Sequence, residues 1–344
     1  MIKLVILIFC ITSIFSFFQY SNKKKEKILL ILIILLIIIA AFRKSDTVAD
    51  YDEYVNIFKN TSSNIEITFS VISKIVNILF FKNVIFVFLI YAILGVSLKT
   101  KAIKELTTLW FLSLLIYISH LYILHELTQI RAGVATGFLL LCIKPLYERN
   151  LRKFLLFATC AVLFHYSALP IYFLWFFKNE RINKYLYAMI IPFSYLIYFL
   201  HIDIIKIFIQ FIPITYIQEK YTMYINLQNV ADDSKKINVF NYVFLAKCLI
   251  FYLLLWKNNV ISYQNKYTIL LLKIEALSLA SYIIFSIMPV FGWRFYELFG
   301  VVEIILIPMV YFVINPKIFS NLIVIFIGLC ILLINIFYAK LIIF

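Results

Sequence analysis

The stretch ILLILIILLIIIAAF at residues 28–42 is apolar from end to end, and it follows a basic run that contains Lys23, Lys24, Lys25 and Lys27. Apolar runs of this kind approach the roughly 20 residues with which a helix crosses a bilayer. They recur along the chain, so that 64% of the residues are hydrophobic and only 14% are charged, whereas soluble domains are about 45–50% apolar. The sequence therefore predicts an all-α, polytopic integral membrane protein.

About ten transmembrane helices are expected within a single transmembrane domain that covers residues 1–344. Two larger loops, 43–82 and 203–238, are expected to face outward, and they hold most of the acidic residues. The spans are placed near residues 2–20, 28–42, 83–98, 106–124, 127–143, 185–201, 239–256, 268–288, 298–314 and 321–338.

The segment 154–177 differs from these spans because basic residues flank it on both sides, which indicates that it starts and ends on the cytoplasmic side. The sequence His165-Tyr166-Ser167, followed by Pro170, divides it into two helices of about 12 residues. Each would be ~18 Å long, too short for a hydrocarbon core of ~30 Å. We therefore expect a re-entrant helical hairpin with His165 near its tip. Irregular backbone at that depth must be buried in protein or line a wet cavity, so the hairpin also predicts a cavity.

The charges sort by side on this topology. The assigned cytoplasmic loops, one of which contains Lys99, hold 17 basic and 4 acidic residues, whereas the opposite side holds 13 basic and 11 acidic residues. This positive-inside pattern explains the net charge of +15 without a nucleic-acid partner, for which the chain offers no soluble domain. A single span at 154–177 would instead reverse the orientation of every later segment.

One arginine lies between two apolar stretches, in the sequence His125-Glu-Leu-Thr-Gln-Ile-Arg131-Ala-Gly133. A guanidinium at the end of a membrane span needs a polar partner, because lipid does not solvate it. The functional interpretation is a binding or catalytic arginine at the outer end of the bundle. The alternative is an interfacial anchor that pairs with Glu126.

A second arginine precedes a span near the other end of the chain. The sequence Met288-Pro-Val-Phe-Gly-Trp-Arg294-Phe-Tyr-Glu297 is expected to be a short outward loop, in which Arg294 and Glu297 can pair at i and i+3. Two outward arginines at helix entrances can instead clamp a diphosphate, since the guanidinium fork matches phosphate oxygens and helix N-termini add positive potential. Arg131 and Arg294 are therefore candidate diphosphate ligands.

The remaining acid–base candidates each have two interpretations. His165 can meet a ligand and exchange protons near neutral pH, or it can simply bond a backbone carbonyl. Asp46 and Asp50 in the first outer loop are either solvated or close to a sugar hydroxyl, where a carboxylate serves as general base or orients the acceptor. Glu275 and Glu303 lie within spans and are either functional or paired with a lysine or tyrosine.

The chain carries no motif for a metal ion or a cofactor. It contains no His-x-x-His, no Asp-rich cluster and no phosphate-cradling glycine loop, and its five cysteines lie in separate apolar segments at unrelated spacings. We expect a site that works without a metal ion or cofactor.

Several short motifs, taken in order, resemble the EpsG-like branch of the Wzy-type polymerases, which build O-antigens and capsular polysaccharides. QIRAGVATGFLLL, with Gln129 and Arg131, is similar to an Asn/Thr-Gln-x-Arg motif that opens a span in that family, and Thr128 replaces the more usual asparagine. The basic turn KPLYERNLRKF and then LFHYSALP, with His165, are similar to a basic loop followed by a Phe-His-x-Ser-Ala motif. The resemblance covers nearly the whole chain.

Two further motifs, one before and one after these, add to the resemblance. An Asp-Thr-x-x-Tyr-like element of the first outer loop corresponds to Asp46 and Thr47 with Asp50 and Tyr51, and the acidic family position is either of the two aspartates. An arginine before a late span corresponds to Arg294.

The resemblance implies a glycosyltransferase of the bacterial inner (cytoplasmic) membrane whose active site faces the periplasm or exterior. Its donor and acceptor would both be oligosaccharides linked to undecaprenyl diphosphate, and a chain-length regulator protein is a candidate partner. Arg131 and Arg294 would stabilise the leaving diphosphate, while His165 would bind phosphate or act with a carboxylate such as Asp50 to activate the acceptor hydroxyl. The expected substrate contacts are Gln129, Asp46, Tyr51, Glu126, Tyr166 and Glu297.

Two other classes of protein remain as alternatives. A flippase for lipid-linked oligosaccharides, or an anion transporter, would also place arginines in a bundle cavity, but repeat symmetry is expected there and none is evident in the sequence. A membrane O-acyltransferase that modifies the glycan would need a histidine-based site on its acyl-donor side.

Overall fold

The structure is a computed structural model, and it describes residues 1–45, 48, 50–60, 65–210, 221–223 and 237–342. Their regular secondary structure is entirely helical, with no strand among them, which confirms the all-α prediction. The helices are α1 (Ile2–Ser16), α2 (Asn22–Ala41), α3 (Tyr51–Lys59), α4 (Ile67–Leu79), α5 (Ile85–Leu106), α6 (Trp110–Ser119), the π-helix η2 (Tyr122–Thr128), α7 (Ile130–Tyr147), α8 (Leu151–Phe164), the 3-10 helix η3 (Tyr166–Phe176), α9 (Lys184–Phe199), α10 (Ile204–Gln210), α12 (Tyr242–Trp256), α13 (Asn258–Gln264), α14 (Thr268–Ile284), α15 (Pro289–Gly300), α16 (Glu303–Leu306), η5 (Ile307–Met309), α17 (Val310–Val313), α18 (Lys317–Leu333) and η6 (Ile334–Tyr338).

Several helices have the length and composition of membrane spans. Within the described residues, α5, α7 and the continuous α18–η6 helix qualify by themselves. Three bent pairs raise the number to six: α6 with η2 at 61°, α12 with α13 at 76°, and α15 with the segment 303–313 at 41°. The expected count of about ten spans is therefore not confirmed.

Helix α2 illustrates why the chain suits a membrane. Leu29, Leu32 and Leu36 are buried against the bundle, whereas Leu30 and Ile31 on other faces are more than half exposed. A helix that is apolar on every side is stable either in a protein interior or in lipid. Because one side of α2 lacks protein cover, its apolar surface is suited to contact with lipid.

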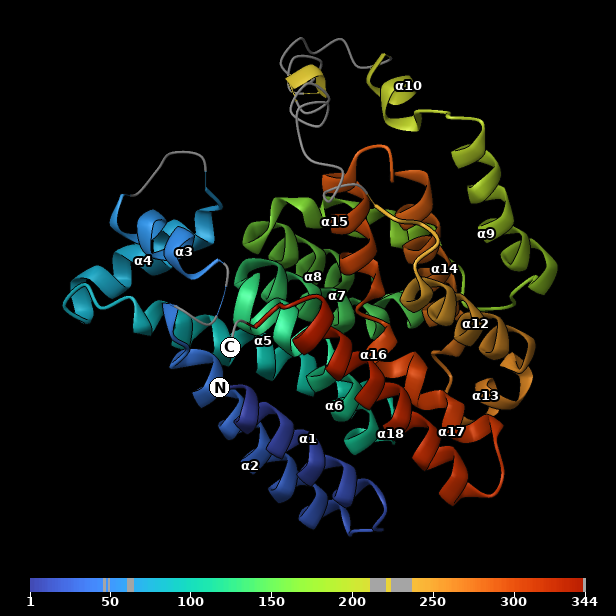
Figure 1. Cartoon of the computed structure of the whole chain (residues 1–344), viewed down its shortest axis with the longest axis horizontal. Coiled ribbons are helices and arrows are strands. Elements are labelled where there is room, and N and C mark those ends of the chain that lie inside the picture. Colours follow the sequence, from blue (N-terminus) through green and yellow to red (C-terminus); the bar gives the residue numbers. More distant parts are fainter. Residues whose placement is uncertain (46–47, 49, 61–64, 211–220, 224–236, 343–344) are drawn as a thin grey trace.

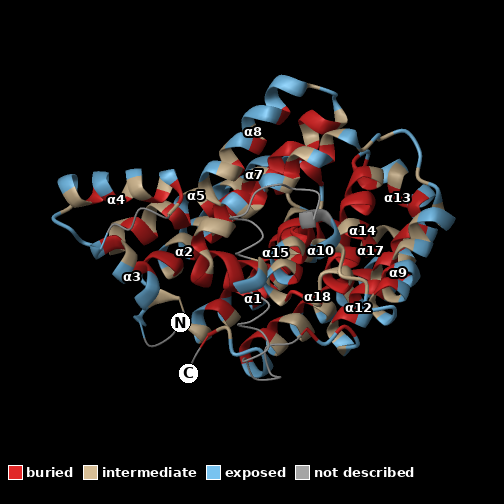
Figure 2. Cartoon of the chain, turned by 90° about the horizontal axis from the view of Figure 1, so that it is seen from above, coloured by how far each residue is buried: buried red, intermediate tan, exposed pale blue. Residues whose placement is uncertain are grey.

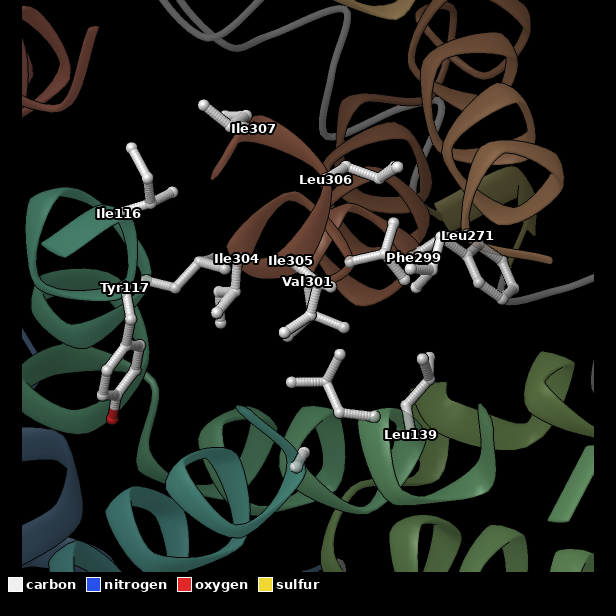
Figure 3. Packing of buried hydrophobic residues seen from close by; sticks show 14 of the residues in the cluster. Ile116, Tyr117, Leu139, Leu271, Phe299, Val301, Ile304, Ile305, Leu306 and Ile307 are labelled. Carbon is white, nitrogen blue, oxygen red and sulfur yellow. The ribbon is translucent and has the colours of Figure 1, made fainter. Parts of the chain in front are cut away.

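The core lies where α6, α7, α14 and the α15–α16 segment meet (Figure 3). Tyr117 of α6, Leu139 of α7, Leu271 of α14 and Ile304 of α16 are all fully buried there. Figure 2 shows buried residues in the interior and exposed residues on the outer faces of the helices. Helices α5 and α7 approach closely at Gly137, where the absence of a side chain leaves room for Leu98. A Cβ added to Gly137 would lie only 2.8 Å from Leu98 Cβ.

Helices α8 and η3 form an antiparallel pair joined at His165. The Arg149 guanidinium, just before α8, donates to the backbone carbonyls of Trp175 and Phe177 at the end of η3, at 2.8 and 2.6 Å. Asn150 caps α8 by accepting from the Lys153 backbone N–H. The two ends of segment 154–177 therefore lie side by side; its entry into the membrane from one side stays a prediction.

Two expectations about local structure are wrong. Residues 289–300 form helix α15 and not a loop, because Pro289 stands at the first helical position, where its fixed φ is favourable and a backbone N–H is not needed. Lys99 does not lie in a cytoplasmic loop, since α5 continues to Leu106 and buries its side chain completely. Within segment 203–238, which is expected to face outward, residues 211–220 and 224–236 lie outside the described residues.

Helices α3 and α4 stand to one side of the bundle (Figure 1) and form most of segment 43–82, which is expected to face outward. They pack through aromatic rings. The ring centre of Phe69 in α4 lies 5.9 Å from that of Tyr54 in α3 and 5.8 Å from that of Tyr91 in α5. Thr68 donates to the carbonyl of Leu163, at 2.8 Å, and so ties the start of α4 to the end of α8. The start of α4 is thereby held next to the turn that contains His165.

Candidate active site

Arg131 lies in the first turn of α7, where the sequence placed it, but its partner is not the expected one. Its Nη1 forms an ion pair with Glu66 Oε2 at the start of α4, and its guanidinium lies 5.5 Å from the ring centre of Tyr54. Glu126, the partner considered from sequence, instead pairs with Lys99. Arg131 is thus neutralised by Glu66, which is not among the site residues expected from the sequence.

Glu66 connects this arginine to the histidine of the hairpin. Its other oxygen, Oε1, lies 3.0 Å from His165 Nδ1. Burial by itself would raise the pKa of Glu66, but the hydrogen bond from His165 and the charge of Arg131 outweigh it and lower the pKa to about 2. The carboxylate is therefore ionised at neutral pH and can only accept hydrogen bonds.

The contact with Glu66 determines how the His165 ring is used. An ionised carboxylate requires a proton on Nδ1, so that Nε2 of a neutral ring carries the lone pair. His165 has an extended backbone conformation, φ −154° and ψ 112°, which ends α8 and turns the chain into η3. This is the arrangement of a general base whose orientation and tautomer are fixed by a carboxylate.

A pocket lies beside His165 and brings together several residues singled out from sequence. It encloses about 290 Å³ of atom-free space, part of which is open to solvent. Its walls come from η2, α7, the hairpin turn and α15. The lining residues are His125, Gln129, Ala132, Thr136, His165, Ser167, Arg294, Glu297 and Leu298.

Arg294 is the cation of this pocket. Its Nη1 lies 3.5 Å from Ser167 Oγ, and the side chain is exposed. No residue in the described part of the chain forms an ion pair with it, including Glu297, the partner considered from sequence. Gln129 and Glu297 line the same pocket. Arg294 can therefore receive an anion, whereas Arg131 is already paired and is not among the lining residues.

Of the two candidate aspartates in segment 43–82, the structure describes one. Asp50 is half-buried within the electrostatic reach of Arg131 and Arg43; burial and Glu53 raise its pKa, and the two arginines act in the opposite direction. Tyr51 packs its ring 5.0 Å from that of Phe88. Asp46 lies outside the described residues, so the choice between the two aspartates stays open.

Two other expected substrate contacts do not line the pocket. Glu126 is buried deep in the bundle, where it pairs with Lys99 and accepts from the Tyr117 hydroxyl at 2.9 Å. Tyr166, next to His165, is about half exposed. Among the described residues, no group of three or more His, Cys, Asp or Glu side chains could hold a metal ion; the expectation of a metal-independent site stays a prediction.

Comparison with known proteins identifies one family. The model of the EpsG family matches residues 26–344, which includes every element of the site. No curated protein and no solved structure matches the chain.

Proposed function

The chain belongs to the EpsG family, and we propose that it is a polysaccharide polymerase. It joins oligosaccharide repeat units that are linked to undecaprenyl diphosphate, at the outer face of the bacterial inner membrane, in O-antigen, capsule or exopolysaccharide synthesis. The observation that carries this proposal is the pocket in which a carboxylate-oriented imidazole and an exposed guanidinium meet, those of His165 and Arg294.

The proposed reaction is a glycosyl transfer. The hydroxyl of the acceptor sugar gives its proton to Nε2 of His165, and its oxygen forms a bond to the anomeric carbon of the donor. The bond between that carbon and the diphosphate oxygen breaks, and undecaprenyl diphosphate leaves with the bonding electrons. Arg294 stabilises the charge that develops on the diphosphate. An imidazole base and a guanidinium supply the charges that this step needs, so the proposal includes no metal ion.

Glu66 and Arg131 are proposed to act through His165. A carboxylate on Nδ1 holds the imidazole in the required tautomer and stabilises the imidazolium that forms when it takes a proton. Arg131 keeps Glu66 ionised and in place, because the two side chains form an ion pair in a mostly buried setting. This pairing supports a positioning role for Arg131 in place of the diphosphate clamp expected from sequence.

The test is the profile of lipid-linked glycans in a deletion strain complemented with variants. We expect wild-type protein to restore the polymer ladder, and His165→Ala and Arg294→Ala to leave single repeat units at the outer face. General-base loss commonly costs about 10²–10⁴-fold in rate, enough to collapse the ladder. The control is Arg152→Ala, an exposed arginine on α8 that lies outside the pocket.

Other outcomes would contradict the proposal. Accumulation of repeat units on the cytoplasmic leaflet of the deletion strain would identify a flippase. A ladder that persists in the deletion strain with only a modification lost would identify a modifying transferase.

A further inference from the structure

His125 is a second histidine of the pocket, and the reaction proposed above does not use it. It lies in the π-helix η2, its side chain has no solvent exposure, and it lines the same pocket as His165 and Arg294. A π-helix adds a residue to the helical turn and recurs at functional sites. Here it places the imidazole beside α7.

The neighbours of His125 determine which ring nitrogen carries the proton. Nδ1 lies 3.3 Å from the Thr136 hydroxyl oxygen. That hydroxyl is 2.9 Å from the carbonyl of Ala132 and 3.0 Å from that of Gly133, and a carbonyl can only accept. Both carbonyls lie closer to the Thr136 hydroxyl oxygen than Nδ1 does, so the geometry favours donation of its one proton to the α7 backbone and acceptance from Nδ1–H of His125. The lone pair of a neutral ring is left on Nε2.

Nε2 of His125 has no hydrogen-bond partner among the described residues, although it is fully buried. A buried acceptor without a donor costs free energy, so such a group in a binding pocket requires an explanation. The missing partner must be a donor. Gln129 and Glu297, which line the same pocket, add further acceptor oxygens to it.

We propose that Nε2 of His125 accepts a hydrogen bond from a sugar hydroxyl of the repeat unit bound in this pocket, which makes His125 a specificity-determining residue. The inference rests on the proposed polymerase function. Sugar hydroxyls are the donors that a glycan supplies, and a pocket with several acceptors beside one guanidinium suits a neutral sugar attached to a diphosphate. A site built to bond a hydroxyl rejects the analogue that lacks it, because its own polar group is then left unpaired.

Polymerisation kinetics with purified protein and a set of monodeoxy repeat-unit analogues test this inference. His125→Phe removes the acceptor nitrogen, His125→Gln retains a carbonyl acceptor, and His201→Asn, at an exposed turn, is the control. We expect His125→Phe to raise KM for the repeat unit roughly tenfold, as for the loss of one hydrogen bond, with a smaller change in kcat. His125→Gln should recover most of the loss.

One deoxy analogue should show the same KM increase with wild-type protein and no further increase with His125→Phe. If the penalties for all analogues are the same in both proteins, the inference is wrong. If wild-type protein forms no polymer at all, it is the proposed function that has failed.

A second measurement does not depend on activity or on the folding of a variant. Nitrogen-15 NMR of wild-type protein labelled at its four histidines distinguishes the two neutral tautomers. We expect His125 to carry its proton on Nδ1. A proton on Nε2 would make that nitrogen a donor and would overturn the inference.

Discussion

Glu66→Gln should lower both stability and catalytic rate, because Glu66 contacts both Arg131 and His165. The pKa of Glu66 is lowered from the ordinary 4.5 to about 2, which corresponds to about 3 kcal/mol of preference for the ionised form. Removing one partner of a buried ion pair commonly costs about 3–5 kcal/mol. We therefore expect the free energy of unfolding to fall by about 3 kcal/mol.

The same substitution should also slow catalysis. Glutamine keeps the shape of the side chain but cannot stabilise an imidazolium on His165, so the rate of linkage formation should fall by about 10²–10⁴-fold while KM changes little. The assay is polymerisation by folded protein in lipid nanodiscs, with thermal unfolding of the same samples. Glu53→Gln, an exposed carboxylate on α3, is the matched control and should leave both quantities within error.

The two readouts separate the explanations of Glu66. A loss of stability together with a wild-type rate per folded molecule would mean that Glu66 stabilises the fold but does not assist His165 in catalysis. An unchanged unfolding temperature would refute the ion pair itself.

Three further predictions concern pH, packing and the anion site. Because the folded pKa of Glu66 lies below its ordinary value, its stabilising contribution should be complete above pH 4.5 and disappear as the pH falls toward 2. The measurement is the difference in the free energy of unfolding between wild type and Glu66→Gln as a function of pH. Gly95→Ala should destabilise the protein by about 1–3 kcal/mol, since the added Cβ would clash with Glu126 Oε2. Gly300→Ala should cost less in the same thermal unfolding assay, because the nearest atom to its added Cβ is 3.1 Å away. Arg294→Lys should lower the polymerisation rate and leave the unfolding temperature unchanged, because the side chain is exposed and an ammonium lacks the bidentate fork.

Local sequence was sufficient for some features of the site. The breaker sequence around His165 predicted a turn between two short helices, and the structure has one, because an extended residue and a following 3-10 helix interrupt α8. Arg131 was expected to open a span and lies in the first turn of α7. These features depend on backbone preferences within a few residues.

Ion pairs between residues distant in the sequence could not be predicted from the sequence. Glu66 is 65 residues from Arg131 and 99 from His165, and nothing in the local pattern of the first outer segment distinguishes it from its acidic neighbours. Lys99 and Glu126 were interpreted as residues of opposite membrane sides, whereas the bend at η2 lets their side chains meet inside the bundle. A single chain offers no signal for such pairs.

The most direct test of the proposed polymerase reaction is polymerisation in a defined system. Purified protein in nanodiscs would receive repeat units linked to undecaprenyl diphosphate, and the products would be the glycan ladder and free undecaprenyl diphosphate. If the proposed reaction is correct, one undecaprenyl diphosphate is released for each new linkage, and both products are lost with His165→Ala. Release without linkage, or a ladder that forms equally well with His165→Ala, would contradict it.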